Sequence, residues 1–128
     1  MSNEKDNLVN LLSQLAKEEY CYLTTKGRKT GKPHEIEIWF CIVSNTLYLL
    51  SGGADGSDWV KNLRANSEVT VRIGKYIFAA TARIVRNIEE ESAIRPLMAA
   101  KYQGWSEGQK LSEWAREALV VGIEITGK

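Results

Sequence analysis

Three strand-like stretches lie within residues 20–50, YCYLTTKGRKTGKPHEIEIWFCIVSNTLYLL, and turn signals separate them. Residues 20–25 are rich in aromatic and β-branched side chains, which favour strands. Residues 26–33 contain two glycines and a proline and cannot continue a strand. Residues 34–43 alternate in the manner of a strand, and a short turn leads to a third strand at residues 46–50. Tight connections of this kind favour antiparallel pairing.

The rest of the chain supplies helices, another hairpin and a final strand. Leucines at helical spacing predict an amphipathic helix over residues 6–19. The other predicted elements are a helix at 58–65 with Ser57 as N-cap, strands at 68–73 and 76–85 that turn at Gly74-Lys75, a helix from about 88 with Asn87 and Glu90 as a capping box, a short helix near 110–117 and a strand at 119–125. Pro96 predicts a kink, or two shorter helices, in the helix that begins near residue 88.

This order of elements predicts an α+β fold that is mainly antiparallel β. About six strands are enough to close a small barrel. The barrel would comprise residues from about 20 to 85 and the closing strand at 119–125, with an N-terminal helix and a helical segment at about 88–117. A length of 128 residues fits a single domain spanning residues 1–128.

The composition is that of an ordinary globular domain, with 44% hydrophobic and 26% charged residues. No apolar run approaches the ~18 residues of a membrane span. The net charge of +1 argues against a partner such as nucleic acid or an anionic membrane. One histidine and two cysteines are too few for an ordinary zinc site, so we expect no metal. The start, MSNEKDN, has no signal-peptide pattern, and we therefore expect a cytoplasmic protein.

Both cysteines, Cys21 and Cys41, lie in apolar strand-like runs. Buried free thiols are the favoured interpretation, because a disulfide would be unusual in a reducing compartment. Neither cysteine has a base nearby in sequence, which argues against a nucleophilic role. Glu35 and Glu37 would share one face of their strand, where two surface carboxylates are the simpler interpretation than an acid–base pair.

Four cations, Lys26, Arg28, Lys29 and Lys32, fall within seven residues, and no acidic residue occurs between Tyr20 and His34. Arginine and lysine side chains at a glycine-containing loop can clamp a phosphate or a carboxylate. A solvated loop that is merely basic fits the spacing equally well. The string is not a P-loop for two reasons: its glycines do not have the required spacing, and no helix is predicted directly after it.

Two further features could contribute to a site. Ser51, Gly52 and Gly53 precede the helix predicted at residues 58–65, whose N-terminus offers N–H donors to an anion. An ordinary turn is the simpler interpretation of this loop alone, because acidic residues follow it. Trp39 and Trp59 could each stack on a planar ring, whereas we expect Trp105 and Trp114 to be core residues.

Together these strings resemble the deazaflavin-dependent nitroreductase family. The resemblance rests on LTTKGRKTGKP at residues 23–33, a following strand with Trp39, Ser-Gly-Gly at 51–53, WVKNLRAN at 59–66 and Val-Thr-Val at 69–71. It runs from about Tyr20 to Val85 in the order of the family. It implies a flavin-reductase-like split β-barrel that uses coenzyme F-420.

The resemblance also implies the cofactor-binding residues. The coenzyme's phosphate and polyglutamate tail would be bound by Arg28, Lys29, Thr30, Gly31, Lys32 and Pro33. Backbone donors to the deazaflavin edge and the ribityl chain would come from Ser51, Gly52 and Gly53. The pocket wall would be completed by Trp59, Asn62 and Leu63. The strand that runs under the ring would contribute His34, Ile36, Ile38 and Trp39. A tail with several carboxylates would explain why the cations are concentrated in one loop of an otherwise slightly acidic chain.

The implied activity is hydride transfer from the reduced deazaflavin to an activated acceptor such as an enone, a quinone or a nitro compound. Catalytic residues stay unassigned, with Tyr22, Tyr48 and His34 as the proton donors to test. The alternatives are a split-barrel reductase or oxidase that binds FMN and a non-catalytic deazaflavin-binding protein. A nucleic-acid-binding barrel is disfavoured by the net charge. Split-barrel relatives are commonly dimers, so a homodimer is a candidate assembly beside the monomer.

Overall fold

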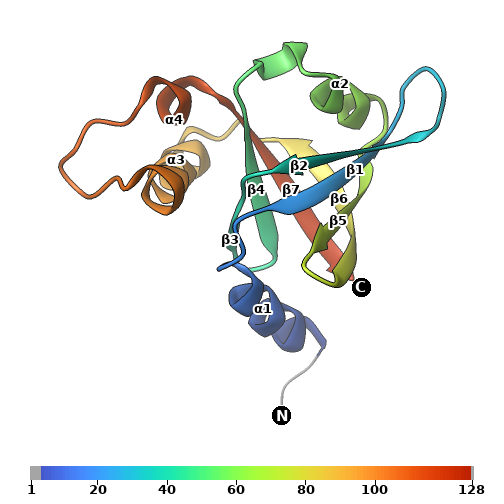
Figure 1. The fold of residues 1–128 in the computed structure, drawn as a ribbon, viewed down its shortest axis with the longest axis horizontal. Coiled ribbons are helices and arrows are strands. Elements are labelled where there is room, and N and C mark those ends of the chain that lie inside the picture. The colour runs from blue at the N-terminus through green and yellow to red at the C-terminus, as the bar shows by residue number, and fades with distance from the viewer. Residues whose placement is uncertain (1–3, 128) are drawn as a thin grey trace.

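A computed structural model describes residues 4–127 as one curled antiparallel sheet with flanking helices. The sheet has seven strands in the order β2-β1-β5-β6-β7-β4-β3 (Figure 1). Their bounds are β1 Cys21–Lys26, β2 Pro33–Ile38, β3 Cys41–Val43, β4 Thr46–Ser51, β5 Glu68–Ile73, β6 Tyr76–Ile84 and β7 Leu119–Gly127. The mainly antiparallel split-barrel fold expected from the sequence is thus confirmed.

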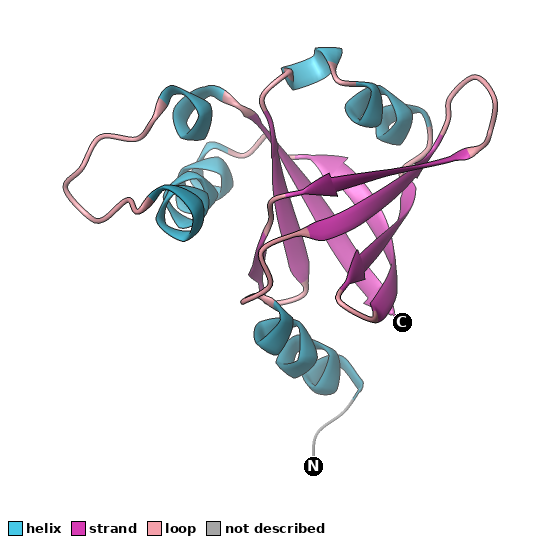
Figure 2. Ribbon diagram, in the orientation of Figure 1, coloured by secondary structure: helices cyan, strands magenta, loops and turns pink. Residues whose placement is uncertain are grey.

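The two edges of the sheet meet where β2 passes into β3. These strands are consecutive in the chain and stand at opposite ends of the strand order, with Trp39 and Phe40 alone between them. Such a short link can join the two edges when the sheet curls into a barrel, as Figure 2 shows. The prediction of one strand over residues 34–43 was therefore wrong, and the extra break raises the strand number from about six to seven.

The strand breaks at Phe40 because its backbone is bonded to a helix and not to a neighbouring strand. The Tyr102 hydroxyl accepts a hydrogen bond from the Phe40 N–H at 2.9 Å. The Lys101 ammonium donates to the Phe40 carbonyl oxygen, also at 2.9 Å, and lies over the Phe40 ring. Burial is the main reason why the pKa of Tyr102 rises to about 12, which keeps this hydroxyl neutral.

Four α-helices and a 3-10 turn surround the barrel: α1 Glu4–Leu15, η1 Ala54–Gly56, α2 Asp58–Ala65, α3 Ile88–Gln103 and α4 Glu113–Glu117. Figure 1 shows α2 at one end of the barrel, α1 near the other end, and α3 with α4 beside it. None of the helices in the described part of the chain is long and apolar enough to cross a membrane.

Several helix predictions need correction. The helix predicted at 6–19 ends at Leu15 and passes into a turn, in which the Glu18 N–H donates to the Leu15 carbonyl at 3.0 Å. α3 is one helix that contains Pro96, so of the two predicted alternatives the pair of shorter helices is wrong. The short helix begins at Glu113, where the Ser112 hydroxyl accepts from the Ala115 N–H and caps it.

The capping predictions were half right. Ser57 occupies the N-cap position of α2 but makes no capping hydrogen bond, because its hydroxyl pairs with that of Ser51 at 2.9 Å. Asn87 caps α3 as predicted, accepting from the Glu90 N–H at 3.0 Å. The Glu90 carboxylate does not return the bond to Asn87 and instead binds Arg83 and Tyr48.

Two apolar clusters stabilise the fold. The larger lies between the curled sheet and α1 and includes fully buried side chains such as Leu12, Leu23, Phe40 and Phe78. The smaller lies under α3 and α4 around Met98. Both cysteines are free and buried, as predicted, and burial raises the pKa of each thiol to about 12. At neutral pH they therefore stay as unreactive thiols.

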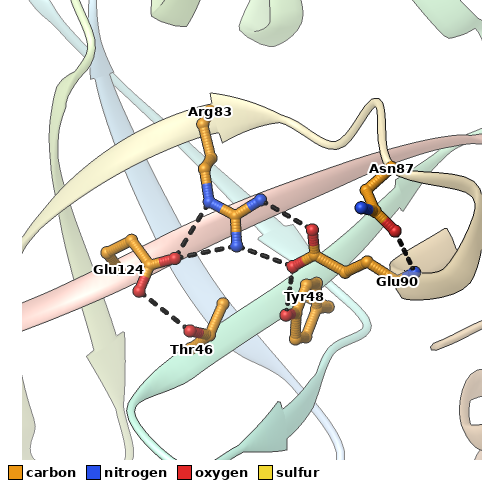
Figure 3. A network of polar contacts seen from close by, with 6 residues as sticks. All are labelled: Thr46, Tyr48, Arg83, Asn87, Glu90 and Glu124. Carbon is orange, nitrogen blue, oxygen red and sulfur yellow. Dashed lines mark hydrogen bonds and ion pairs between the residues drawn. The ribbon is translucent and has the colours of Figure 1, made fainter. Parts of the chain in front are cut away.

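A polar network joins three strands to the start of α3 (Figure 3). The Arg83 guanidinium donates to both carboxylate oxygens of Glu90, at 3.0 and 2.6 Å. It also binds Glu124 on β7 at 2.9 Å. The buried Tyr48 on β4 donates its hydroxyl proton to Glu90 at 2.5 Å, while Thr46 donates to Glu124. The network therefore fixes the N-terminal end of α3 against the sheet.

Replacing Glu90 by glutamine is expected to make folding stability less sensitive to acid. Hydrogen bonds from Arg83 and then Tyr48 lower the pKa of Glu90 in the folded state. A group whose folded pKa is lowered stabilises the protein above its unfolded pKa, and the stability is lost as the pH falls through the folded pKa. The wild type should exceed Glu90→Gln by about 1 kcal/mol at pH 7 in urea unfolding, and the difference should shrink below about pH 5.

The matched control is Glu89→Gln, which removes the same charge from the same helical turn at an exposed position. Its unfolding free energy should follow the wild-type pH dependence. If the two variants lose stability equally at every pH, the Arg83 network does not contribute in the way described.

Candidate functional site

A pocket of about 440 Å³ opens between the β1–β2 loop and α2. This size lies within the range of roughly 300–1,000 Å³ that is usual for small-molecule sites. The two elements lie side by side at one end of the barrel in Figure 1. The lining residues are Thr25, Gly27, Arg28, Lys29, Thr30, His34, Glu35, Ile36, Asp58, Trp59 and Asn62. The basic loop and the tryptophan-bearing helix, both singled out in the sequence, therefore form one cavity.

Asn62 joins the loop to the helix. It is buried on α2, and its Oδ1 accepts from the Arg28 backbone N–H at 3.2 Å and from the Arg28 side chain at 2.8 Å. Its Nδ2 donates to the Oγ1 atom of Thr25, a residue buried on β1, at 3.2 Å. The Asn62 amide thus provides hydrogen-bond partners for Arg28 in the loop and for Thr25 on β1. Buried polar groups in folded proteins nearly always have such a partner.

These contacts fix the position of Arg28 but leave part of its guanidinium accessible. Its side chain is 29% exposed and also contacts Asp58 at 3.4 Å. Since Asp58 is 85% exposed, solvent screens this ion pair, and it contributes little stability. A guanidinium has five N–H donors, so several stay available to a ligand.

The basic loop is shaped by its own backbone. The Gly27 N–H donates to the Lys32 carbonyl and the Gly31 N–H donates to the Gly27 carbonyl, both at 2.8 Å. Thr30 Oγ1 accepts from the Lys32 N–H at 3.2 Å. Gly31 has a φ of +74°, a conformation that glycine adopts without strain. The cations are thus carried on a defined turn and not on a loose linker.

Besides the basic loop, the pocket is lined by apolar and by acidic side chains. Trp59 on α2 and Ile36 on β2 are half-buried and pack against the main core, leaving flat apolar surface toward the cavity. Glu35 and Asp58 also line the pocket and were absent from the sequence-predicted site. The register pairs Thr25 with His34 and Thr24 with Glu35, which brings Thr25 and Glu35 to the same end of β1 and β2. The sequence alone does not give this register.

Gly27 allows His34 to lie against the loop. A Cβ atom on Gly27 would lie 2.7 Å from the Nε2 atom and 2.9 Å from the Cδ2 atom of the His34 ring. A Cβ atom essentially never approaches another atom so closely without a bond. The ring can therefore occupy its position because residue 27 has no side chain. The loop and the first residues of β2 are therefore matched in shape.

Other sequence-predicted residues lie outside this pocket. Ser51 is buried and its hydroxyl binds Ala54 and Ser57. Gly52 and Gly53 approach the side chains of Trp114 and Ser57, respectively. Gly31 and Pro33 line a smaller pocket of about 250 Å³ on the β5 side of the loop.

Trp39, Ile38 and Leu63 pack elsewhere. The Trp39 ring stacks on Tyr102 at 4.3 Å between ring centroids and meets Trp114 edge-on at 5.6 Å. Ile38 packs against the main core, and Leu63 is 2% exposed within it. Trp105 and Trp114 are half-buried.

Among the three candidate proton donors, His34 lines the pocket. The Tyr22 hydroxyl donates to Glu37 at 2.7 Å. The Arg72 guanidinium carbon lies over the Tyr22 ring, 4.1 Å from the ring centroid. The Tyr48 hydroxyl belongs to the Arg83 network, and mainly burial raises its pKa to about 12. The hydroxyls of Tyr22 and Tyr48 thus donate hydrogen bonds to carboxylates that lie outside the pocket.

The fold places the chain among the small split β-barrel proteins of the flavin-reductase type. Its structure is similar to an F-420-H2-dependent reductase at 25% identity and a TM-score of 0.63, covering 83% of this chain and 94% of that one. Residues 2–121 match the family described as F-420H(2)-dependent quinone reductase, so the chain belongs to this family. It is accordingly an oxidoreductase that depends on coenzyme F-420.

Two other solved structures share the fold at lower identity. An F-420 reductase has 16% identity and a TM-score of 0.63, covering 90% of this chain and 93% of that one. The heme storage protein HutZ from Vibrio cholerae has 15% identity and a TM-score of 0.68, covering 94% and 92%. Such likenesses show the fold alone, because one barrel can carry different sites.

The pocket residues fit the coenzyme. A planar ring needs a flat apolar wall, which Trp59 and Ile36 supply. A phosphate and a chain of carboxylates need cationic N–H donors, which the Arg28 and Lys29 side chains supply. Both requirements are met by residues that line one cavity.

Proposed function

We propose that the pocket between the basic loop and α2 binds coenzyme F-420 and that the chain reduces a small electrophilic acceptor there. The observation that carries the proposal is the position of Arg28. It belongs to the loop that resembles the family's anion-binding string, and Asn62 holds it at a cavity whose other wall carries Trp59. Arg28 and Lys29, which line the pocket, would bind the phosphate and the tail together with Lys32, which lies in the same loop outside the lining. Trp59 with Ile36 would contact the ring.

In this proposal the bound reduced coenzyme supplies a hydride to the acceptor. The chain's own residues bind and orient the two reactants. The defined turn of the basic loop fixes the anionic end of the coenzyme, so that its ring is held against Trp59. The apolar wall excludes water on the ring side, which favours transfer to the acceptor over side reactions.

The acceptor class we propose is a quinone, an enone or a nitro compound. These acceptors are planar and electron-poor, and they can stack against a ring system. The family description names quinones, which makes a simple quinone the first acceptor to test.

The proposal is tested by adding purified protein to reduced F-420 with menadione, cyclohexenone or a nitroimidazole and following the absorbance of the oxidised coenzyme. We expect protein-dependent oxidation with at least one acceptor and none when reduced FMN replaces the deazaflavin. Tight binding without turnover of any acceptor would favour a non-catalytic carrier, and turnover with FMN alone would favour the flavin alternative.

A further inference from the structure

His34 is a titratable side chain of the pocket that the described residues leave without a polar partner. Within residues 4–127, the His34 imidazole makes no hydrogen bond or ion pair, although it is exposed to the cavity. Arg28 and Asn62 bind each other, and Tyr22 and Tyr48 bind carboxylates. The His34 ring therefore has hydrogen-bonding capacity that no protein group takes up, although its Nε2 edge lies against Gly27.

The position of this ring is fixed by shape. His34 is the second residue of β2 and pairs with Thr25, which Asn62 holds from α2. Its Nε2 edge lies against Gly27, where any side chain would displace it. The charged groups that line the same cavity are Arg28 and Lys29 from the loop, Glu35 from β2 and Asp58 from α2.

We infer that His34 is the proton donor of the proposed reduction. The inference rests on the proposed function, since it needs the coenzyme and the acceptor in this pocket. Imidazole is the side chain that most often transfers protons near neutral pH. Because the ring lines the cavity and makes no hydrogen bond to the described part of the protein, it can contact an acceptor's oxygen while the cations hold the coenzyme.

The bound reduced coenzyme would supply a hydride, so that a carbon–hydrogen or oxygen–hydrogen bond would form on the acceptor as the coenzyme's carbon–hydrogen bond broke. The acceptor thereby gains an oxyanion, which is an enolate for an enone or a hydroquinone anion for a quinone. A proton passes from a His34 ring nitrogen to that oxygen, and solvent returns a proton to the ring. The acceptor is reduced by two electrons and the coenzyme is oxidised by two.

The single histidine of the chain gives a direct readout that is independent of activity. The ring protons of His34 should give one set of histidine signals in a proton NMR spectrum. Adding oxidised F-420 to the wild type should shift this set. A coenzyme that binds without moving the His34 signals would overturn the inference.

His34→Ala tests the chemistry. Because His34 is exposed, the variant should fold, and its loss of coenzyme affinity should be much smaller than its loss of kcat. Its kcat with an enone or a quinone should fall about 100-fold or more, as is typical when a general acid is removed. Imidazole in solution should restore part of the rate, whereas 1,3-dimethylimidazolium, which has no N–H, should not.

Gly27→Ala tests the placement of the ring. The new methyl group should push the flexible His34 side chain away, so that the His34 NMR signals shift in the free protein while the Tm changes little. The kcat should fall with His34 itself still present. A His34→Ala variant that keeps its kcat, or one that loses only coenzyme affinity, would contradict the inference. Failure of the wild type to bind F-420 would instead reject the proposed function.

Discussion

Replacing Asn62 by alanine is expected to weaken both the fold and the coenzyme site. The variant would leave the Arg28 backbone N–H and the buried Thr25 hydroxyl without their partner. Unpaired buried groups of this kind cost about 1–3 kcal/mol each, and we expect a loss of about 2 kcal/mol in urea unfolding. The freed Arg28 side chain should also make F-420 bind at least tenfold more weakly.

Asn62→Asp separates the two effects. Its carboxylate keeps the acceptor for Arg28, and the Thr25 hydroxyl can turn to donate to the second oxygen. Stability should therefore fall less than in Asn62→Ala. Coenzyme affinity should still decrease, because a negative charge beside Arg28 opposes an anionic ligand. An alanine variant that unfolds at the wild-type urea concentration would show that this amide does not join loop and helix.

Replacing Phe40 by alanine is expected to give the largest loss of stability. Phe40 is fully buried in the main core at the point where the two edges of the sheet meet. Removing a buried phenylalanine side chain costs about 3–5 kcal/mol, which is a large part of the roughly 5–15 kcal/mol that stabilises a domain. The Tm should fall by about 10 °C or more in thermal unfolding followed by circular dichroism.

Leu97→Ala is the matched control, since Leu97 lies on α3 with 45% of its surface exposed. Its unfolding free energy should change by less than about 0.5 kcal/mol, because little apolar surface is lost from the core. Equal Tm values for the Phe40 and Leu97 variants would mean that the junction between β2 and β3 does not hold the barrel closed.

The sequence predicted most accurately where local chemistry sets the boundaries. The helix at 58–65 agrees residue for residue with α2, and the β5–β6 hairpin turns at Gly74, whose φ of +58° suits glycine. The break at Phe40 could not be predicted, because the alternation of residues 34–43 continues through it. That break depends on Tyr102 and Lys101, which are distant in the chain.

The candidate site divides in the same way. The basic loop and the helix with Trp59 and Asn62 were named from sequence strings, and the structure brings them to one pocket. Glu35 and Asp58 were not foreseen as lining residues, because their place depends on strand register and on the approach of α2 to the loop. The cofactor-binding roles themselves stay predictions.

The most direct test of the account is a fluorescence titration of F-420 with the wild type, Arg28→Ala and Arg116→Ala. The two variants lose the same charge, but Arg116 lies on α4, outside the lining of the pocket, where it pairs with Glu117. Charged hydrogen bonds to an anion contribute about 1.5–3 kcal/mol, so the Kd should rise about 10-fold to 100-fold in Arg28→Ala and stay at the wild-type value in Arg116→Ala. A wild type that does not bind F-420, or an Arg28→Ala variant that binds it with unchanged Kd, would contradict the account.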